Sequence, residues 1–503
     1  MGTAEATGVK SGSGLYQAEY GHFINGKWEG STSGEKIGLY NPATGDLLSN
    51  IQSGNAADAV RAVEAAYGAF PSWRQSRPHQ RQEILFEMGR RMRARLHDYA
   101  MLESLNNGKP LMEAMYFDLP MAIEQFEMFA GSAFHLHGES ISTATALGIV
   151  HREPLGVCAQ IIPWNVPLVM MAAKIAPALA AGNTIVLKPS EIVCLGVMEF
   201  FKEMADLIPP GVVNVITGYG PNIGEALVTH PKVRKVAFTG SRPTAQKLIQ
   251  YAAVNVIPQT MELGGKSANI VCEDADLDAA AEGAAMSVVL NKGEVCLAGS
   301  RVFVHEKIKD AFLEKFQANL RKVKLGDPTD PTTQMGPQAS RMQLEKISSY
   351  LELGPKEGAT LLMGGKVAKV PGFEKGHFIE PTIFTDVKNN MRIAQEEIFG
   401  PVSTVITWKD DEEVVRMAND STYGLGGGLW TQNLRRAHRI SQAIETGTIW
   451  VNRYYNFVPG MPVGGYKQSG FGREFAQEVL HHYTLTKSVI INLEEGSIGV
   501  FGR

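Results

Sequence analysis

Residues 157–162 read VCAQII, and this short apolar run begins the pattern that decides the fold class of the chain. An amphipathic segment follows the run. Similar apolar runs recur at residues 184–187, 212–216 and 235–238, and each is again followed by an amphipathic segment. Strands that alternate with helices in this way are typical of βαβ units and a parallel sheet. The sequence therefore predicts a doubly wound α/β domain.

A second cycle of strand and helix begins at residues 267–272 and continues to about Trp450. A predicted helix at 279–290 follows its first strand. At 503 residues, the chain exceeds the size at which a single hydrophobic core stops growing. We therefore expect two or three domains, with a boundary near Gly264 and Gly265.

The segment before this alternation is predicted to be mainly helical. Residues 22–28 form an expected hairpin, with an Asn-Gly dipeptide at its turn. Apolar residues at three- and four-residue spacing predict helices over 56–69, 80–105 and 111–134.

Composition and charge exclude several functional classes. The formal net charge is -4, and Lys and Arg are scattered along the chain. This gives no basic footprint for nucleic acid or for an anionic membrane, so neither is expected as a partner. The first thirty residues carry no secretory signal pattern, and no run of eighteen apolar residues follows. We expect a soluble protein of the cytoplasm.

The four cysteines are widely spaced, with no CxxC pair and no histidine at zinc-finger spacing; they are Cys158, Cys194, Cys272 and Cys296. Neither a disulfide framework nor a metal site is predicted. In a reducing compartment all four would be thiols.

Cys296 ends a glycine-containing loop, and Glu262 opens the sequence Glu-Leu-Gly-Gly-Lys some way before it. A thiol nucleophile and a carboxylate base together suit chemistry that passes through an acyl-enzyme. Taken alone, Cys296 would be explained as well by a small buried side chain. Glu262 alone could equally belong to a surface salt bridge.

Two glycine turns are candidates for binding a dinucleotide. Residues 218–224 have one residue too many for the G-x-G-x-x-G pattern, and we interpret them as an ordinary strand-to-helix turn. Gly240 and Ser241 follow a predicted strand and precede a helix that starts near Pro243, where backbone N–H groups could meet a pyrophosphate. A simple turn explains this second site about equally well.

Seven motifs that occur in a fixed order favour the functional explanation of these residues over the structural one. They are Pro163-Trp164-Asn165, Lys188-Pro189-Ser190-Glu191, Phe238-Thr239-Gly240-Ser241, Glu262-Leu263-Gly264-Gly265-Lys266, the loop ending at Cys296, Glu397-Ile398-Phe399-Gly400-Pro401, and Gly464-Gly465-Tyr466-Lys467-Gln468-Ser469-Gly470. In this combination the chain resembles the NAD(P)-dependent, hydrolytic, non-acylating branch of the aldehyde dehydrogenase superfamily over essentially its whole length.

The resemblance implies three parts: a Rossmann-like NAD-binding domain, an α/β catalytic domain and a small projecting β element for oligomerisation. We assign residues 1–135 and 153–264 to the first, 265–464 to the second, and 136–152 with 483–497 to the third. The projecting strands would leave unpaired edges that need cover. We expect a homotetramer, a dimer of dimers, with a dimer as the alternative.

The resemblance also implies roles at the reaction centre. Cys296 would be the nucleophile, Asn165 with the backbone N–H of Cys296 the oxyanion hole, and Glu262 the general base. The predicted reaction is the NAD-dependent oxidation of an aldehyde to a carboxylic acid through a thiohemiacetal and a thioester at Cys296. Lys174 and Glu474 match positions linked with proton relay, although structural pairing explains them nearly as well.

Two alternatives to this reaction remain. A CoA-acylating relative typically lacks the general-base glutamate, so Glu262 favours hydrolysis. A non-catalytic structural relative of the same fold is the alternative from another class. Such a chain could lose its cysteine or its base, and this one has both.

For the cofactor, the resemblance implies that Lys188 and Glu191 hold the adenosine ribose. A carboxylate there would repel a 2′-phosphate, so NAD is favoured over NADP. Glu397 and Phe399 would hold the nicotinamide ribose and ring. The other expected cofactor contacts are Trp164, Gly240, Ser241 and Leu263.

Small side chains stand at three positions where relatives that take small aldehydes carry bulky aromatic rings; they are Val166, Ala173 and Val463. With Met170, Leu290, Tyr455 and Phe457 they predict a wide apolar tunnel. This favours an aromatic or medium-chain aldehyde, and phenylacetaldehyde is our specific prediction. Arg453 could instead contact the carboxylate of a semialdehyde. Betaine aldehyde is the remaining alternative, although part of the aromatic wall that favours its ammonium group is missing.

Overall fold

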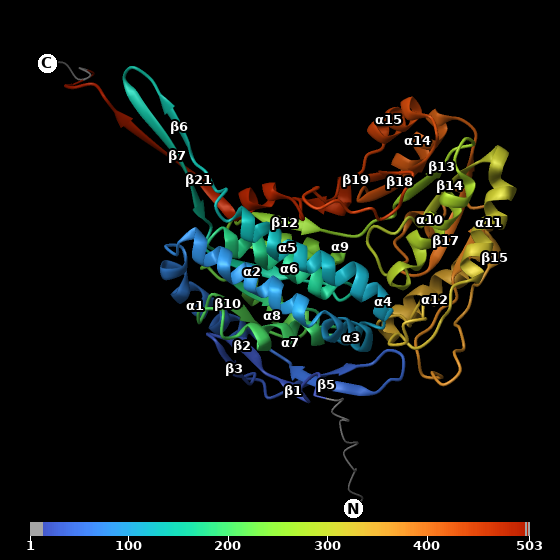
Figure 1. Ribbon diagram of the computed structural model, residues 1–503, viewed down its shortest axis with the longest axis horizontal. Coiled ribbons are helices and arrows are strands. Elements are labelled where there is room, and N and C mark those ends of the chain that lie inside the picture. The colour runs from blue at the N-terminus through green and yellow to red at the C-terminus, as the bar shows by residue number, and fades with distance from the viewer. Residues whose placement is uncertain (1–13, 498–499, 501–503) are drawn as a thin grey trace, which may run out of the picture.

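The computed structural model describes residues 14–497 and 500, so the first thirteen residues of the predicted NAD-binding domain lie outside the described part. It contains two α/β bodies and a small sheet that projects from the first of them (Figure 1). The mixed α/β class predicted from the sequence is confirmed. In the described part, no helix is long and apolar enough to cross a membrane.

The first body is built on an eight-stranded sheet with the order β20-β12-β11-β8-β9-β10-β2-β3. Its parallel strands are β8 (Val157–Ile161), β9 (Thr184–Lys188), β10 (Val213–Val215), β11 (Val233–Thr239) and β12 (Gln259–Glu262). The antiparallel edges are β2 (His22–Ile24) with β3 (Lys27–Glu29) and β20 (Gly470–Phe471). Asn25 and Gly26 both have positive φ at the β2–β3 turn, which confirms the predicted hairpin.

Helices cover both faces of this sheet. On one face lie α2 (Pro78–Ala94), α3 (Leu96–Asn107), α5 (Leu119–Ser132), α6 (Pro167–Ala180) and α7 (Leu195–Met204). On the other lie α1 (Ala56–Trp73), α8 (Gly220–Val228) and α9 (Arg242–Ala253). Each face buries its own hydrophobic cluster, which is why the strands read as continuous apolar runs in the sequence.

Two helix predictions need correction. The helix expected at 80–105 is broken at Arg95, whose φ of -114° and ψ of 28° are not helical, so α2 ends and α3 begins there. The helix expected at 111–134 is α4 (Leu111–Glu113), a π-helical turn η1 (Ala114–Asp118) and then α5. A π turn inserts one extra residue and changes which side chains face inward. Apolar spacing does not show either irregularity, because the pattern is nearly continuous across it.

The second body is built on a seven-stranded sheet with the order β15-β16-β17-β14-β13-β18-β19. Its strands are β13 (Ala268–Val271), β14 (Arg301–His305), β15 (Thr360–Met363), β16 (Thr382–Thr385), β17 (Val402–Trp408), β18 (Gly426–Trp430) and β19 (Thr448–Val451), all parallel to their neighbours except β15. Its helices are α10 (Leu277–Val289), η2 (Leu290–Gly293), η3 (Glu306–Ile308), α11 (Lys309–Arg321), α12 (Arg341–Lys356), α13 (Arg392–Gln395), α14 (Asp411–Asn419) and α15 (Leu434–Ala443). Glu262 ends a strand of the first sheet and Ala268 begins one of the second.

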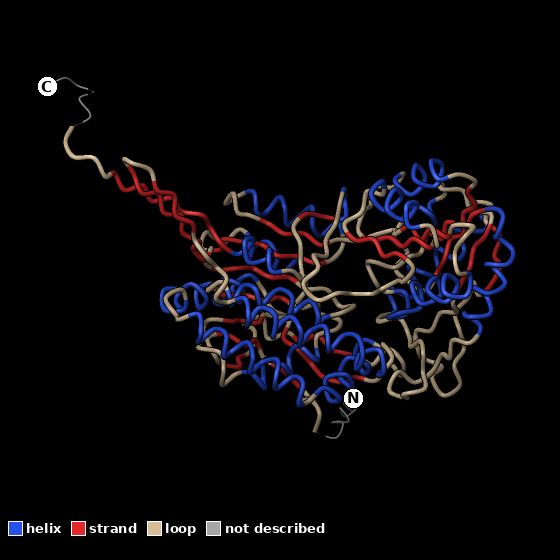
Figure 2. The backbone as a smooth tube through the Cα atoms, turned by 45° about the horizontal axis from the view of Figure 1, so that its top comes forward, coloured by secondary structure: helices blue, strands red, loops and turns tan. Residues whose placement is uncertain are grey.

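After β19 the chain returns to the first body through η4 (Lys467–Ser469), β20 and η5 (Gln477–Tyr483). It then enters the projecting sheet of β6 (Glu139–Ser142), β7 (Ala146–Pro154) and β21 (Thr484–Asn492), which Figure 2 shows as a long ribbon extending from the body. A further small sheet joins β1 (Glu19–Tyr20), β5 (Leu47–Gln52) and β4 (Lys36–Tyr40).

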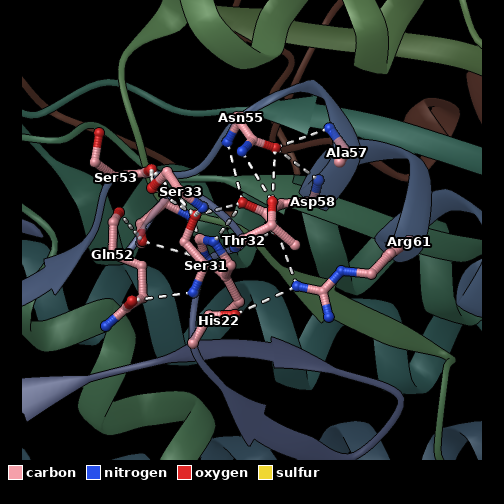
Figure 3. A network of polar contacts seen from close by, with 12 residues as sticks. His22, Ser31, Thr32, Ser33, Gln52, Ser53, Asn55, Ala57, Asp58 and Arg61 are labelled. Carbon is pink, nitrogen blue, oxygen red and sulfur yellow. Dashed lines mark hydrogen bonds and ion pairs between the residues drawn. The ribbon is translucent and has the colours of Figure 1, made fainter. Parts of the chain in front are cut away.

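A network of polar contacts ties the segment before β4 to the start of α1 (Figure 3). At its centre Asp58 is fully buried and accepts hydrogen bonds from the Ser31 hydroxyl at 2.6 Å and the Thr32 backbone N–H at 3.1 Å. It also accepts from the Asn55 backbone N–H at 3.1 Å and from Arg61 at 2.9 Å. Although burial alone would raise the pKa of Asp58, the hydrogen bonds from Ser31, Thr32, Arg61 and Asn55 hold it well below its usual value.

Candidate active site

Cys296, Glu262 and Asn165 line one cavity of about 90 Å³ between the two bodies. Glu262 is the last residue of β12, Asn165 lies between β8 and α6, and Cys296 follows η2. The first two therefore come from the carboxyl ends of parallel strands, the edge at which open α/β sheets bind ligands. The structure thus brings together the three residues expected to carry the reaction.

Asn165 is buried and fixed against the loop that carries the thiol. Its side-chain Nδ2 donates to the backbone carbonyl of Glu294 at 2.8 Å. The backbone carbonyl of Asn165 accepts from Asn291 Nδ2 at 2.8 Å and from Lys109 Nζ at 3.0 Å. The side-chain amide carries two N–H donors, and one of them is used by Glu294. The other is a donor of the kind that an oxyanion hole requires.

The loop before Cys296 has an uncommon backbone. Asn291, Lys292 and Gly293 have φ values of 46°, 60° and 76°. Left-handed conformations cost free energy at residues other than glycine, so surrounding contacts must stabilise them. Lys292 supplies these contacts from a fully buried position, with its Nζ 3.1 Å from Glu294 Oε2 and donating to the Asn107 carbonyl at 3.1 Å. The loop is therefore a rigid support for the thiol.

The Cys296 thiol is half-buried at the cavity wall. Burial and then the nearby carboxyl groups of Glu397 and Glu262 raise its pKa to about 12. The thiol is thus protonated at neutral pH in the protein alone. It becomes a nucleophile only when a base or a positive charge acts on it.

Glu262 is buried, and its Oε1 has no hydrogen-bond partner. Burial raises the pKa of Glu262 well above its usual value, the Glu474 carboxyl raises it further, and Lys174 opposes both. Lys174 and Glu474 themselves form a buried ion pair at 2.6 Å. A carboxyl group with a raised pKa is a stronger base than an ordinary glutamate, which suits a general base.

A separate cleft of about 400 Å³ opens at the carboxyl ends of β8, β9 and β11. Five of the expected cofactor residues line it, namely Trp164, Lys188, Glu191, Gly240 and Ser241. Lys188 Nζ lies 3.2 Å from Glu191 Oε2. Gly240 has no room for a side chain, since a Cβ would lie 2.5 Å from the Phe238 ring. The cleft also meets the first turn of α9, where backbone N–H groups are free to bind an anion.

The glycine turn that we interpreted as an ordinary turn also reaches this cleft. Gly220, Pro221 and Gly224, at the start of α8, form part of its lining. The interpretation was therefore incomplete. The spacing differs from the dinucleotide pattern because the helix begins within the motif, and the pattern alone could not show which face of that helix points to the cleft.

The remaining cofactor candidates lie elsewhere. Glu397 is half-buried in the second body, with a pKa raised by burial and opposed by Lys346, and its Oε1 accepts from the Gly265 N–H at 3.1 Å. The Phe399 ring stands edge-on to Trp164 at 5.4 Å between centroids, which connects it to the cleft. Leu263 lines the cavity of Cys296 rather than the cleft.

A larger chamber of about 470 Å³ adjoins the cavity of Cys296 and opens to the outside. Both spaces are lined by Met121, Phe457, Val463 and Phe475, which therefore form the neck between them. Arg453 lines the outer chamber and is exposed. Among the described residues it has neither an ion-pair nor a hydrogen-bond partner.

Residues 28–489 match the model of the aldehyde dehydrogenase family. The chain belongs to this family. It is 43% identical to acetaldehyde dehydrogenase 2 of Cupriavidus necator, with 97% of each chain covered. Among solved structures, it is similar to PnpE of Pseudomonas sp. WBC-3 in complex with nicotinamide adenine dinucleotide, with a TM-score of 0.94, 42% identity, and 96% of this chain and 100% of the other covered.

Betaine aldehyde dehydrogenase of Staphylococcus aureus in complex with NAD+ is also similar, with a TM-score of 0.94, 36% identity, and 96% of this chain and 97% of the other covered. These matches confirm the family, the fold class and the enzyme class predicted from the sequence. Both solved relatives hold NAD, the cofactor expected here.

Among the residues expected to line the substrate tunnel, six line the cavity of Cys296; they are Val166, Met170, Leu290, Tyr455, Phe457 and Val463. Ala173 does not. It lies further along α6, fully buried in the core of the first body. Because α6 is buried on all sides, its sequence pattern does not distinguish residues that face the core from residues that face the cavity.

The expectation of a wide tunnel is wrong for the inner cavity, whose volume of about 90 Å³ is well below the roughly 300 Å³ at which ligand pockets usually begin. The sequence reasoning missed Phe117, whose ring packs edge-on against Tyr455 and Phe457 at 6.3 and 5.7 Å between centroids. Phe117 lies in the π turn, so a regular helical pattern could not have placed it. Met121, Phe475 and Glu113 were missed as well.

Proposed function

We propose that this protein oxidises an apolar aldehyde to the corresponding carboxylic acid with NAD, through a thioester at Cys296. The observation that carries the proposal is the meeting of Cys296, Asn165 and Glu262 in one cavity. A non-catalytic relative would have no need to keep a thiol, an oxyanion donor and an unpaired buried carboxyl group together. We therefore favour an enzyme over a structural role.

The residues of the cleft fit a dinucleotide. Lys188 and Glu191 would hold the adenosine ribose, and Gly240 with Ser241 at the start of α9 would hold the pyrophosphate. Glu397, with Phe399 beside it, would hold the nicotinamide end. When bound, NAD supplies a hydride acceptor and a positive charge near the thiol. The carboxylate of Glu191 favours NAD over NADP.

The chain's own groups account for the remaining chemistry. The Cys296 thiolate adds to the aldehyde carbon, and Asn165 donates to the oxygen on which negative charge develops. After hydride loss, Glu262 takes a proton from the water molecule that adds to the thioester. The carbon–sulfur bond then breaks, so that the acid leaves and the thiolate returns. Lys174 and Glu474 would pass the proton onward from Glu262.

For the substrate, we propose an aromatic or medium-chain aldehyde, with phenylacetaldehyde as the test compound. The narrow inner cavity suits the reactive end of such a molecule, and the larger outer chamber suits an apolar remainder. Phe117, Tyr455 and Phe457 provide aromatic surface at the position of a substrate ring. The relatives named above differ in the aldehyde of their names, so the family does not decide this point.

One observation favours a second candidate. Arg453 lies exposed at the outer chamber without a partner among the described residues, which suits the carboxylate of a long semialdehyde. Betaine aldehyde gains no comparable support, because Asp118, a carboxylate that lines the cavity of Cys296, is already paired with Lys109.

The projecting sheet supports a homotetramer, since β21 carries exposed apolar side chains along an unpaired edge; they include Leu485, Val489, Ile490 and Ile491. A thiol nucleophile also needs a reducing compartment, and we propose the cytoplasm. Light scattering at micromolar protein concentration tests the assembly, and a monomer would contradict it.

Steady-state kinetics over aliphatic, aromatic, cationic and carboxylate-bearing aldehydes, with NAD and with NADP, tests the reaction and the substrate together. We expect kcat/KM to be highest for phenylacetaldehyde among phenylacetaldehyde, acetaldehyde, succinic semialdehyde and betaine aldehyde. A preference of about tenfold or more, or roughly 1.4 kcal/mol, for one of the others would overturn the substrate proposal. Absence of NADH formation with every aldehyde would overturn the reaction itself.

A further inference from the structure

A second cluster of buried polar side chains lies behind Glu262, on the face of the first sheet that α6 and η5 cover. Gln160 on β8 and Lys235 on β11 belong to it. In the register of these parallel strands, Lys235 pairs with Cys158 and Ala237 pairs with Gln160. Because side chains alternate along a strand, Gln160 and Lys235 point to the same side as diagonal neighbours.

Hydrogen bonds join this cluster to the buried ion pair beside Glu262. Gln160 Nε2 donates to the Lys174 carbonyl at 2.7 Å and to the Tyr483 hydroxyl at 3.2 Å. Lys235 Nζ lies over the Tyr483 ring, 5.0 Å from its centroid. Glu474 holds Lys174 from the cavity side. The cluster is thus continuous from the cavity of Cys296 to η5.

Several polar atoms of the cluster have no hydrogen-bond partner. Glu474 Oε2, Gln160 Oε1 and Glu262 Oε1 are unpaired acceptors in buried positions. Lys235 is itself buried, and in the described part of the chain it has neither a hydrogen-bond nor an ion-pair partner. Buried polar groups are nearly always paired, so each exception asks for an explanation. Free acceptors and a free donor in one cluster are what proton transfer requires.

His482 directly precedes Tyr483 on η5 and is half-buried. Burial lowers the pKa of Lys235 to about 8. Burial, and then the charge of Lys235, lower the pKa of His482. Lys235 can therefore exchange a proton near neutral pH. The charged and titratable groups that face Lys235 and His482 are Cys158, Lys174, Glu474, Glu478, His481 and Tyr483.

We propose that Lys235 and His482 form the outer half of a proton route that runs from Glu262 through Glu474 to the surface. The proposal rests on the function proposed above. Water adds to the thioester carbon and gives one proton to Glu262, and the carbon–sulfur bond breaks with the sulfur leaving as thiolate. The proton then moves from Glu262 to Glu474, Lys235 and His482, which restores the carboxylate for the next turnover.

Stopped-flow measurement of NADH separates the two halves of the reaction, with the best aldehyde of the kinetic panel as substrate. The burst reports thioester formation, and the slow phase reports hydrolysis. In Lys235→Met we expect an unchanged burst and a hydrolysis rate that falls roughly tenfold or more near pH 7. The variant should fold, because methionine has a similar shape and removes a buried cation that lacks a partner.

A second variant distinguishes a need for proton release by residue 235 from a need for its positive charge alone. Lys235→Arg keeps the positive charge but cannot release a proton near neutral pH, so hydrolysis should remain slow. Arg234→Met is the matched control. It removes one cation from the neighbouring position of β11, where the side chain is exposed on the opposite face, and all rates should match the wild type.

Hydrolysis at the wild-type rate and with the wild-type pH profile in Lys235→Met would overturn the route. So would full activity in Lys235→Arg, because charge alone would then suffice. If Lys235→Arg does not fold, the pH profile of Lys235→Met decides the question. A wild-type enzyme that forms no NADH with any aldehyde of the panel would overturn the proposed function as well, whereas NADH formation with unchanged hydrolysis in Lys235→Met would overturn only the route.

Discussion

Two buried carboxyl groups in the first body are used in opposite ways. Asp58 is surrounded by donors from Ser31, Thr32, Asn55 and Arg61, and its pKa is lowered. Glu262 has an oxygen with no donor at all, and its pKa is raised. Both groups are removed from water, so burial does not account for the difference. Donors make the first carboxylate a structural anchor, and their absence leaves the second able to react.

The comparison is tested most severely by Glu262→Gln. We expect the hydrolysis rate to fall by about two to four orders of magnitude, since glutamine cannot accept the proton from water. Stability should stay the same or rise, because a strained acidic group is lost. Rapid-mixing kinetics should still show one NADH burst, and mass spectrometry should find acylated Cys296. Cys296→Ala is the control and should give no burst while still binding NAD.

A slow steady state of Glu262→Gln without any acyl-enzyme would place the role of Glu262 before hydride transfer. The base would then act on the thiol rather than on water.

For Asp58→Asn the reverse result is expected. The asparagine amide would place an N–H group where the donors of Ser31, Thr32 and Asn55 already point, and Arg61 would keep only Glu29 as an anionic partner. We expect the free energy of unfolding to fall by about 3 kcal/mol, from the loss of several hydrogen bonds to a buried charge. Turnover per folded molecule should not change. Chemical denaturation measures the free energy of unfolding, and kinetics on the same preparation measure the turnover. A large loss of kcat in the folded variant would contradict the structural role of Asp58.

The strands of this site could be predicted from the sequence to within one or two residues, because continuous apolar runs mark buried parallel strands. Motif order singled out Cys296, Glu262 and Asn165, and these three residues line one cavity. The direction in which a helical side chain points, toward the cavity or toward the core, could not be predicted in the same way. Ala173 lies in a helix that is buried on all sides, where spacing does not tell cavity from core. Phe117 lies in a π turn, where regular helical spacing does not hold.

The hydrogen-bond donors around Asp58 also could not be predicted from the sequence. Ser31 and Thr32 come from a loop, and nothing in their local pattern indicates contact with a helix start further along the chain. Such contacts depend on how the segment before β4 packs, which is a tertiary property. The neighbours of Lys235 could not be predicted for the same reason, because they too depend on tertiary packing.

The two carboxyl groups should also differ in their pH dependence. Glu262 works as a base only when ionised, and its pKa is raised, so hydrolysis should increase as pH rises through a value well above that of an ordinary glutamate. Asp58 has a lowered pKa in the folded protein. Its stabilisation is complete above the unfolded-state value of about 4 and is lost as pH falls below it.

Denaturation of the wild type and Asp58→Asn at several pH values, together with hydrolysis rates over the same range, checks this separation. The stability difference between the two proteins should shrink toward low pH. A hydrolysis profile that is flat from pH 5 upward would show that Glu262 keeps an ordinary pKa.

The smallest effect is expected for Arg61→Ala, which removes one donor of Asp58 and leaves the others. Arg61 is partly exposed, and it also pairs with Glu29 at 3.1 Å. Water can replace part of its contribution, so we expect a loss of about 1 kcal/mol or less in the free energy of unfolding. If Asp58 is stabilised by the whole set of donors, this loss should be far smaller than that of Asp58→Asn. Equal losses in the two variants would mean that Arg61 alone holds the carboxylate, and the contrast with Glu262 would then reduce to the presence or absence of a single cation.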